Sequence, residues 1–344
     1  MSLRTPCTEL FKIQHPIMLA GMNVAAGPEL AAAVTNAGGL GVIGGVGYTP
    51  KMLKSIIAEL KDDLKDKNAP FGVDLLLPQV GGSARKTNKD YTGGQLDALI
   101  DIIIEEKAAL FVCAVGVPPK HVIEKLHKAG IPVMNMVGAP KHAVKACELG
   151  VDLICAQAGE GGGHTGSIPF SLLIPEVVDI CRKYKSPLTG KPVQVIAAGG
   201  VYRGSSLAAA LSYGATGVWV GTRFICAEEA GASKKHQEAV MKAGYDDTVR
   251  TLIYTGRPLR VIRTPFINDW EENKQDKIKE LTSKGTVPVG MEPEDPSNRP
   301  FLSGQTAAVI HEVKPAKAIV DEMVAEAVKA LQSASKYAVA QAKL

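Results

Sequence analysis

The stretch Val151-Asp152-Leu153-Ile154-Cys155-Ala156-Gln157-Ala158-Gly159-Glu160-Gly161-Gly162-Gly163-His164-Thr165-Gly166 decides how this chain is interpreted. Its first part is short and apolar, as buried parallel strands are. Four glycines in five residues follow, and then a single histidine. Glycine lets the backbone approach a flat or charged ligand closely, and ligand sites of α/β folds lie at the carboxyl ends of strands. We therefore predict a ligand-binding loop ending in His164 rather than a turn with a surface histidine.

Outside this stretch, short apolar runs alternate with runs of helical periodicity. Strict alternation implies parallel strands joined by right-handed crossovers. Eight strand–helix units predict a closed (β/α)8 TIM barrel, with a doubly wound open sheet as the structural alternative. The expected strands are 17–21, 40–44, 71–77, 110–114, 133–137, 152–157, 193–198 and 217–220, and the expected helices between them are 28–37, 50–64, 95–107, 119–128, 141–149, 171–184 and 203–213.

The alternation stops after Thr222. We expect the barrel domain to comprise residues 1–222 and 312–344, with a final helix over 315–336 that completes the outer ring. Residues 223–311 are expected to form a smaller helical lobe on the substrate side of the barrel mouth. Within the barrel, the polar stretch 81–92 predicts a loop long enough to act as a lid.

Composition limits the classes of protein to which this chain can belong. Of the 344 residues, 46% are hydrophobic, enough for a large core, and the net charge is only +4. Without a basic run interleaved with aromatic residues we expect no nucleic-acid partner, and without an apolar run of spanning length we expect no membrane segment. Six cysteines without metal-type spacing are interpreted as buried apolar side chains, which predicts a reducing, cytoplasmic location. In a eukaryote, the ending Ala342-Lys343-Leu344 would instead favour the peroxisome.

Two glycine-containing stretches predict a phosphate site. Ala198-Gly199-Gly200-Val201 ends the seventh expected strand, and Gly221-Thr222-Arg223-Phe224 ends the eighth. Loops after these two strands of a barrel commonly bind phosphate through backbone N–H groups. The glycines would let the backbone reach the anion, Thr222 would add a hydroxyl donor and Arg223 a charge. The pair predicts a phosphorylated cofactor or substrate.

Polar side chains also occur near the ends of apolar strands. Asp74, Asn135 and Gln157 need hydrogen-bond partners there. For Asp74 and Asn135, bonds to a ring ligand and structural bonds to neighbouring loops are equally favoured, whereas Gln157 leads directly into the glycine-rich loop. No metal-ligand spacing is present, so we predict no metal ion. No nucleophile elbow, Walker loop or Rossmann fingerprint is present either, which argues against a serine hydrolase, a P-loop enzyme and a Rossmann NAD site.

These motifs together resemble the nitronate monooxygenase family, formerly called 2-nitropropane dioxygenase. The resemblance covers about residues 10–331. It rests on Ala20-Gly21-Met22, Asn36-Ala37-Gly38-Gly39-Leu40-Gly41, the loop 161–166, Ala198-Gly199-Gly200-Val201, Gly221-Thr222-Arg223-Phe224 and Ser303-Gly304-Gln305. It implies an FMN-containing TIM barrel that oxidises alkyl nitronates with oxygen to carbonyl compounds and nitrite.

The resemblance also implies roles for individual residues. His164 would be the catalytic residue, facing the N5 side of the flavin. Two positions depart from the usual pattern: Gly161 stands where relatives more usually have alanine, and Asp74 where they often have asparagine. The residues implied to hold the cofactor are Ala20, Gly21 and Met22 along the flavin, Asp74, Asn135 and Gln157 near its ring or ribityl chain, and Gly163, Gly199, Gly200, Gly221 and Thr222 around its phosphate.

Several functional alternatives stay open at this point. His164 could remove the α-proton of a neutral nitroalkane as a base, or hold the nitro oxygens as a cation. The nearest rival function is an NAD(P)H-dependent reductase of quinones or enoyl thioesters on the same barrel, and a further one is a non-catalytic flavin-binding protein. Enzymes like inosine monophosphate dehydrogenase rank last, because no cysteine lies in a loop after a strand. A homodimer is a possible oligomeric state.

Overall fold

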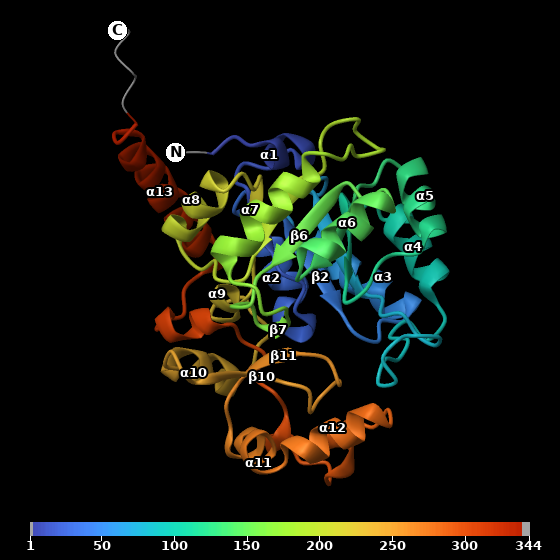
Figure 1. Cartoon of the computed structure of the whole chain (residues 1–344). Helices are drawn as coiled ribbons and strands as arrows, with labels where there is room; N and C mark the ends of the chain where they lie inside the picture. Colours follow the sequence, from blue (N-terminus) through green and yellow to red (C-terminus); the bar gives the residue numbers. More distant parts are fainter. Residues whose placement is uncertain (1–2, 339–344) are drawn as a thin grey trace, which may run out of the picture.

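Eight parallel strands form the TIM barrel that the alternation predicts, which rules out the open-sheet alternative (Figure 1). The computed structural model describes residues 3–338, so the ending Ala342-Lys343-Leu344 lies outside the described residues. The strand order is β1-β9-β8-β6-β5-β4-β3-β2, and the bridge between Met18 and Leu40 closes the ring between β1 and β2. The strands are β1 (Ile17–Leu19), β2 (Gly41–Gly45), β3 (Phe71–Leu76), β4 (Leu110–Ala114), β5 (Val133–Val137), β6 (Leu153–Gln157), β8 (Gln194–Ala198) and β9 (Gly217–Val220).

Helices surround the strands. The last long helix, α13, packs against α8 and α2 and so completes the outer ring. Among residues 3–338 no helix is both long enough and apolar enough to cross a membrane. The helices of this part are α1 (Pro6–Phe11), α2 (Pro28–Asn36), α3 (Pro50–Asp63), α4 (Leu96–Glu105), α5 (Lys120–Lys128), α6 (Pro140–Glu148), α7 (Phe170–Cys181), α8 (Gly204–Ser212) and α13 (Ala316–Ser335), with the 3-10 helix η1 (Asn23–Ala26) after β1.

Successive residues of each strand face opposite sides of the barrel wall. On β4, Val112 belongs to the interior cluster, whereas Phe111 and Cys113 belong to the cluster between strands and helices. The interior cluster is small and includes Met18, Leu153 and Trp219. The barrel interior is therefore a packed core, and a ligand has room only at one of its ends.

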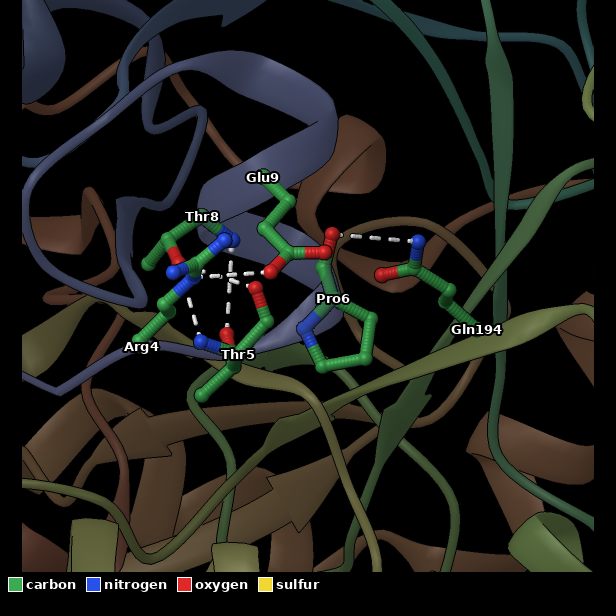
Figure 2. Close-up of polar contacts among 6 residues, drawn as sticks. All are labelled: Arg4, Thr5, Pro6, Thr8, Glu9 and Gln194. Atoms are coloured by element: carbon green, nitrogen blue, oxygen red, sulfur yellow. Dashed lines mark hydrogen bonds and ion pairs between the residues drawn. The ribbon is translucent and has the colours of Figure 1, made fainter.

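The short helix α1 covers the amino ends of the strands (Figure 2). Thr5 and Thr8 cap it reciprocally, with Thr5 N–H donating to Thr8 Oγ1 at 2.9 Å. Its Cys7 and Phe11 join the interior cluster. Gln194, the first residue of β8, donates through Nε2 to the Pro6 carbonyl at 3.4 Å. This end of the barrel is closed by protein.

Most of the segment between β9 and α13 lies at the opposite end, where Figure 1 shows α10, α11, α12, β10 and β11. It is not purely helical as expected, because β10 and β11 pair as an antiparallel hairpin and β11 also pairs with β7, which lies within the glycine-rich loop. A separate apolar cluster around Trp270 supports this sheet. The elements are β7 (Gly163–His164), β10 (Thr248–Thr251), β11 (Leu259–Ile262), α9 (Thr222–Ile225), α10 (Lys234–Lys242), α11 (Pro265–Asn273), α12 (Gln275–Ser283) and the 3-10 helices η2 (Pro288–Met291), η3 (Pro296–Asn298) and η4 (Gln305–Val309).

Candidate active site

Small residues line the carboxyl end of the barrel. Ala20 follows β1 and Ala198 ends β8, and both belong to the interior cluster. Gly221, after β9, lies so close that a Cβ atom there would be 3.4 Å from Ala20 Cβ and from Met22 Sδ. The structure thus brings Ala20, Met22 and Gly221 together where a flat ligand would need space.

Asp74 of β3 lies at this end with an unpaired carboxyl oxygen. The residue is 3% exposed, and its Oδ1 has no hydrogen-bond partner among the described residues. Its side chain fits only because two neighbours are glycines: a Cβ on Gly21 would lie 2.6 Å from Asp74 Oδ2, and one on Gly44 would lie 2.5 Å from Asp74 Cβ. Burial raises the pKa of Asp74 to about 8. This buried oxygen therefore has a free position for a hydrogen bond with a ligand.

Gln157 holds the glycine-rich loop in place. Its Nε2 donates to the carbonyl of His164 at 2.7 Å and to that of Gly162 at 3.2 Å. Gly163 has a φ of 66°, which favours glycine, and a Cβ there would meet open space. Gly199, with a φ of 79°, packs so tightly that a Cβ would lie 2.7 Å from the Ala158 carbonyl oxygen. The loop therefore joins the ends of β6 and β8.

His164 is oriented by a residue that the sequence analysis did not identify. Its Nε2 lies 3.0 Å from Thr255 Oγ1, which also accepts the N–H of Arg257 at 3.3 Å. The contact is possible because β7 pairs with β11, placing His164 opposite Leu259. Burial, and secondarily the Arg257 charge, lower the pKa of His164 to about 4. The imidazole is therefore neutral near pH 7.

The two glycine-containing stretches lie at the expected end, with one exception. Gly200 has a φ of 84°, and Thr222 Oγ1 accepts the N–H of Gly304 at 2.9 Å, which leaves the hydroxyl hydrogen available to a ligand. Arg223 does not join them. Its Nη1 donates to the Glu312 carbonyl at 3.0 Å, and the side chain lines a small cavity against α13.

Asn135 makes structural hydrogen bonds, which is one of the two possibilities left open for it. Its strand neighbours Met134 and Met136 pack with the interior cluster, while Val133 and Val137 pack in the outer one. The period of two along a strand therefore turns Asn135 away from the barrel interior. Its amide donates to the Cys113 carbonyl at 2.9 Å and the Gly116 carbonyl at 2.7 Å. Asn135 fixes the end of β4, and its Oδ1 is buried without a partner.

The described residues do not assemble a metal site. Within 3–338, no group of three or more His, Cys, Asp or Glu side chains is arranged to hold a metal ion. All six cysteines are buried and none forms a disulfide, although Cys147 Sγ and Cys181 Sγ lie within hydrogen-bond distance at 3.9 Å. The groups at the carboxyl end that can take part in chemistry include the neutral imidazole of His164, the buried carboxyl group of Asp74 and the nearby Arg257.

Comparison with known proteins identifies the family to which this chain belongs. The nitronate monooxygenase family profile matches residues 4–326. A hydroxy-methyl-oxo-octahydroindene carboxyl-CoA dehydrogenase of Rhodococcus jostii is 37% identical, over 79% of this chain and 69% of the relative. A probable nitronate monooxygenase of Staphylococcus saprophyticus is 31% identical, over 79% and 82%. The structure of FabK from Thermotoga maritima superposes with a TM-score of 0.79 at 31% identity, covering 98% of this chain and 100% of FabK.

The family match spans nearly the whole chain, including the barrel, the glycine-rich loop and most of the segment after β9. The family and its structural neighbours are flavin-dependent oxidoreductases. The chain is therefore an oxidoreductase of the nitronate monooxygenase family.

Proposed function

We propose that this protein binds FMN and oxidises alkyl nitronates with oxygen to carbonyl compounds and nitrite, with His164 as its catalytic residue. One observation carries the proposal: a neutral histidine is held at the carboxyl end of the barrel by Thr255, beside a floor of small residues. The nitronate monooxygenase profile over residues 4–326 supports the same reaction.

The residues present fit FMN. The unpaired Oδ1 of Asp74 offers a hydrogen-bonding atom to the ring system, and the neighbouring Ala20, Gly21 and Met22 carry no charge or bulky branched side chain that would exclude a flat ring. Gly199 and Gly200 follow β8 and have the left-handed backbone conformation, and Thr222 follows the neighbouring strand β9. Two such strand ends side by side suit a phosphate group. When bound, the flavin supplies the redox chemistry with oxygen.

The chain's own contribution is to position the substrate and to move a proton. Because the pKa of His164 is lowered to about 4, the base role is favoured over the cationic role. If Nε2–H donates to Thr255 Oγ1, the lone pair on Nδ1 is free to take the α-proton of a nitroalkane. Gln157 fixes the backbone of the same residue through its carbonyl, and the contact with Thr255 orients the imidazole.

A second candidate is an NAD(P)H-dependent flavin reductase acting on a thioester. Two observations favour it: the full-length superposition on FabK and the 37% identity to a carboxyl-CoA dehydrogenase. A neutral base beside a flavin would serve proton transfer at a carbon next to a thioester carbonyl equally well.

Anaerobic mixing separates the two candidates. The purified flavoprotein is mixed with excess NADPH or NADH, and the flavin absorbance is followed; an alkyl nitronate is then added. We expect no bleaching with either nucleotide and rapid bleaching with the nitronate. Rapid bleaching by a nucleotide, with no response to the nitronate, would replace the first candidate by the second.

A further inference from the structure

Two guanidinium groups, those of Arg85 and Arg257, lie close together at the edge of the candidate site. Arg257 follows the turn that holds His164, and its Nε donates to Asn88 Oδ1 at 3.0 Å. Arg85 Nη1 points to the Gly256 carbonyl at 3.4 Å. Gly256 packs so closely against Thr87 that a Cβ there would lie 2.3 Å from Thr87 Oγ1. The loop 81–92, predicted to be a lid, thus lies against the 255–258 turn.

No carboxylate balances these charges. Among the described residues there are seventeen ion pairs, and none of them includes Arg85 or Arg257. Burial, and then the Arg85 charge, lower the pKa of Arg257. Two like charges held together this way repel one another, so the arrangement costs stability unless an anion binds between them.

Further positive charge comes from α6. His142 lies close enough to Lys141, Lys145 and Arg257 for each of these charges to lower its pKa, after the larger effect of burial. Neither lysine has a carboxylate partner within ion-pair distance among the described residues. The rim therefore gathers four cations from the loop 81–92, the 255–258 turn and α6. A small nitronate carries a single negative charge and does not require such a cluster.

We propose that Arg85 and Arg257 form a phosphate-binding subsite that holds the phosphorylated end of an extended substrate or co-substrate while its reactive end reaches His164. Guanidinium groups match phosphate oxygens with two parallel hydrogen bonds, and a cluster of cations raises the local concentration of a polyanion. The link from Arg257 through Thr255 to His164 places this subsite beside the catalytic residue.

This subsite goes beyond nitronate oxidation, since simple nitronates carry no phosphate. Two kinds of molecule share the required chemistry. A coenzyme A thioester ends in adenosine with a 3′-phosphate and a 5′-diphosphate, and NADPH ends in adenosine with a 2′-phosphate and a 5′-diphosphate. The two are distinguished by the position of the ribose phosphate.

Calorimetric titration of the holoprotein tests the subsite without any turnover. The probes are adenosine 3′,5′-bisphosphate and adenosine 2′,5′-bisphosphate, added to wild-type protein and to the variants Arg85→Ala, Arg257→Ala and Arg182→Ala. Arg182 is the matched control, because it pairs with Asp179 on the exposed face of α7. Flavin content and melting temperature of each variant verify that it is folded.

We expect at least one bisphosphate to bind, with an affinity that falls about tenfold or more in Arg85→Ala and in Arg257→Ala, falls with added salt, and is unchanged in Arg182→Ala. Tighter binding of the 3′ isomer identifies a thioester, tighter binding of the 2′ isomer identifies NADPH, and equal binding still supports the subsite. The proposal is overturned if neither probe binds, or if folded Arg85→Ala and Arg257→Ala bind as wild type does. Either result leaves the nitronate reaction untouched, because no probe is a substrate.

Discussion

Two buried aspartates at opposite ends of the barrel differ in whether the protein supplies hydrogen-bond partners to their carboxyl groups. Asp152, 2% exposed just before β6, accepts hydrogen bonds from Ser186 Oγ at 2.6 Å and from Val133 N–H at 2.8 Å, and lies 2.8 Å from His127 Nε2. Asp74, 3% exposed within β3, keeps one oxygen without a partner. The two carboxyl groups are equally buried, but only one is satisfied by protein.

The difference separates the end of the barrel that provides stability from the end that binds ligand. At the amino end, α1 covers the strands and Asp152 ties β5 and β6 to the residues before β8. At the carboxyl end, small residues and an unpaired carboxyl oxygen leave room and an unsatisfied polar atom. Barrel enzymes place their chemistry at the carboxyl end, and the predictions below test whether the two ends of this barrel divide the roles in this way.

The largest effect is expected from His164→Asn, which should affect catalysis alone. Loss of the base should lower turnover of neutral nitroalkanes by about 10²- to 10⁴-fold, while turnover of preformed nitronates falls far less. Steady-state nitrite release with both substrate forms measures this, with His121→Asn on the exposed face of α5 as control. An equal loss with both forms would exclude the base role.

The next effect is a loss of stability from Asp152→Ala. Removing the carboxylate leaves the buried Val133 N–H and the partly exposed His127 ring without their acceptor, so the free energy of unfolding should fall by roughly 3 kcal/mol. Urea unfolding measures it, and the exposed Asp97→Ala should change it by less than about 0.5 kcal/mol. A loss below about 1 kcal/mol for Asp152→Ala would remove the contrast between the two ends.

A smaller, pH-dependent effect should follow from Asp74→Asn. With a folded-state pKa of about 8 against 3.8 when unfolded, the folded protein binds more protons between these values, so its stability falls as pH rises through this window. Between pH 6.5 and 8, flavin-free wild type should lose about 2 kcal/mol that the variant keeps, and the titration of His164 cancels from the comparison because both proteins contain it. Unfolding at both pH values measures the difference, and parallel curves for the two proteins would contradict it.

Most of the barrel could be predicted from sequence, because its strands are continuous apolar runs with local boundaries. Strands β4, β5 and β9 have the bounds that the pattern predicts, and the others differ by a few residues at most. Strands β7, β10 and β11 were not predicted. The two residues of β7 are a glycine and a histidine, which favour a strand only when β11 supplies the pairing edge.

The site could be predicted only in part. The glycine-rich loop and His164 were identifiable because they follow a strand directly, but Thr255 and Arg257 lie about ninety residues away and reach His164 through β11. For Asn135 the sequence left ligand bonds and structural bonds equally favoured, because the apolar run around it does not reveal which side of the barrel wall its side chain faces. The one sequence signal for this contact was Thr255-Gly256-Arg257-Pro258, whose glycine and proline are typical of a turn.

The most direct test of the division between the two ends is titration of FMN into flavin-free wild-type protein and into Asp74→Ala and Asp152→Ala, at a temperature where all three are folded. We predict that Asp74→Ala weakens FMN binding about tenfold or more, because the ring loses its buried hydrogen-bonding partner. Asp152→Ala should bind FMN within about twofold of wild type despite its lower stability. Wild-type affinity in Asp74→Ala, or a larger loss in Asp152→Ala, would contradict the account.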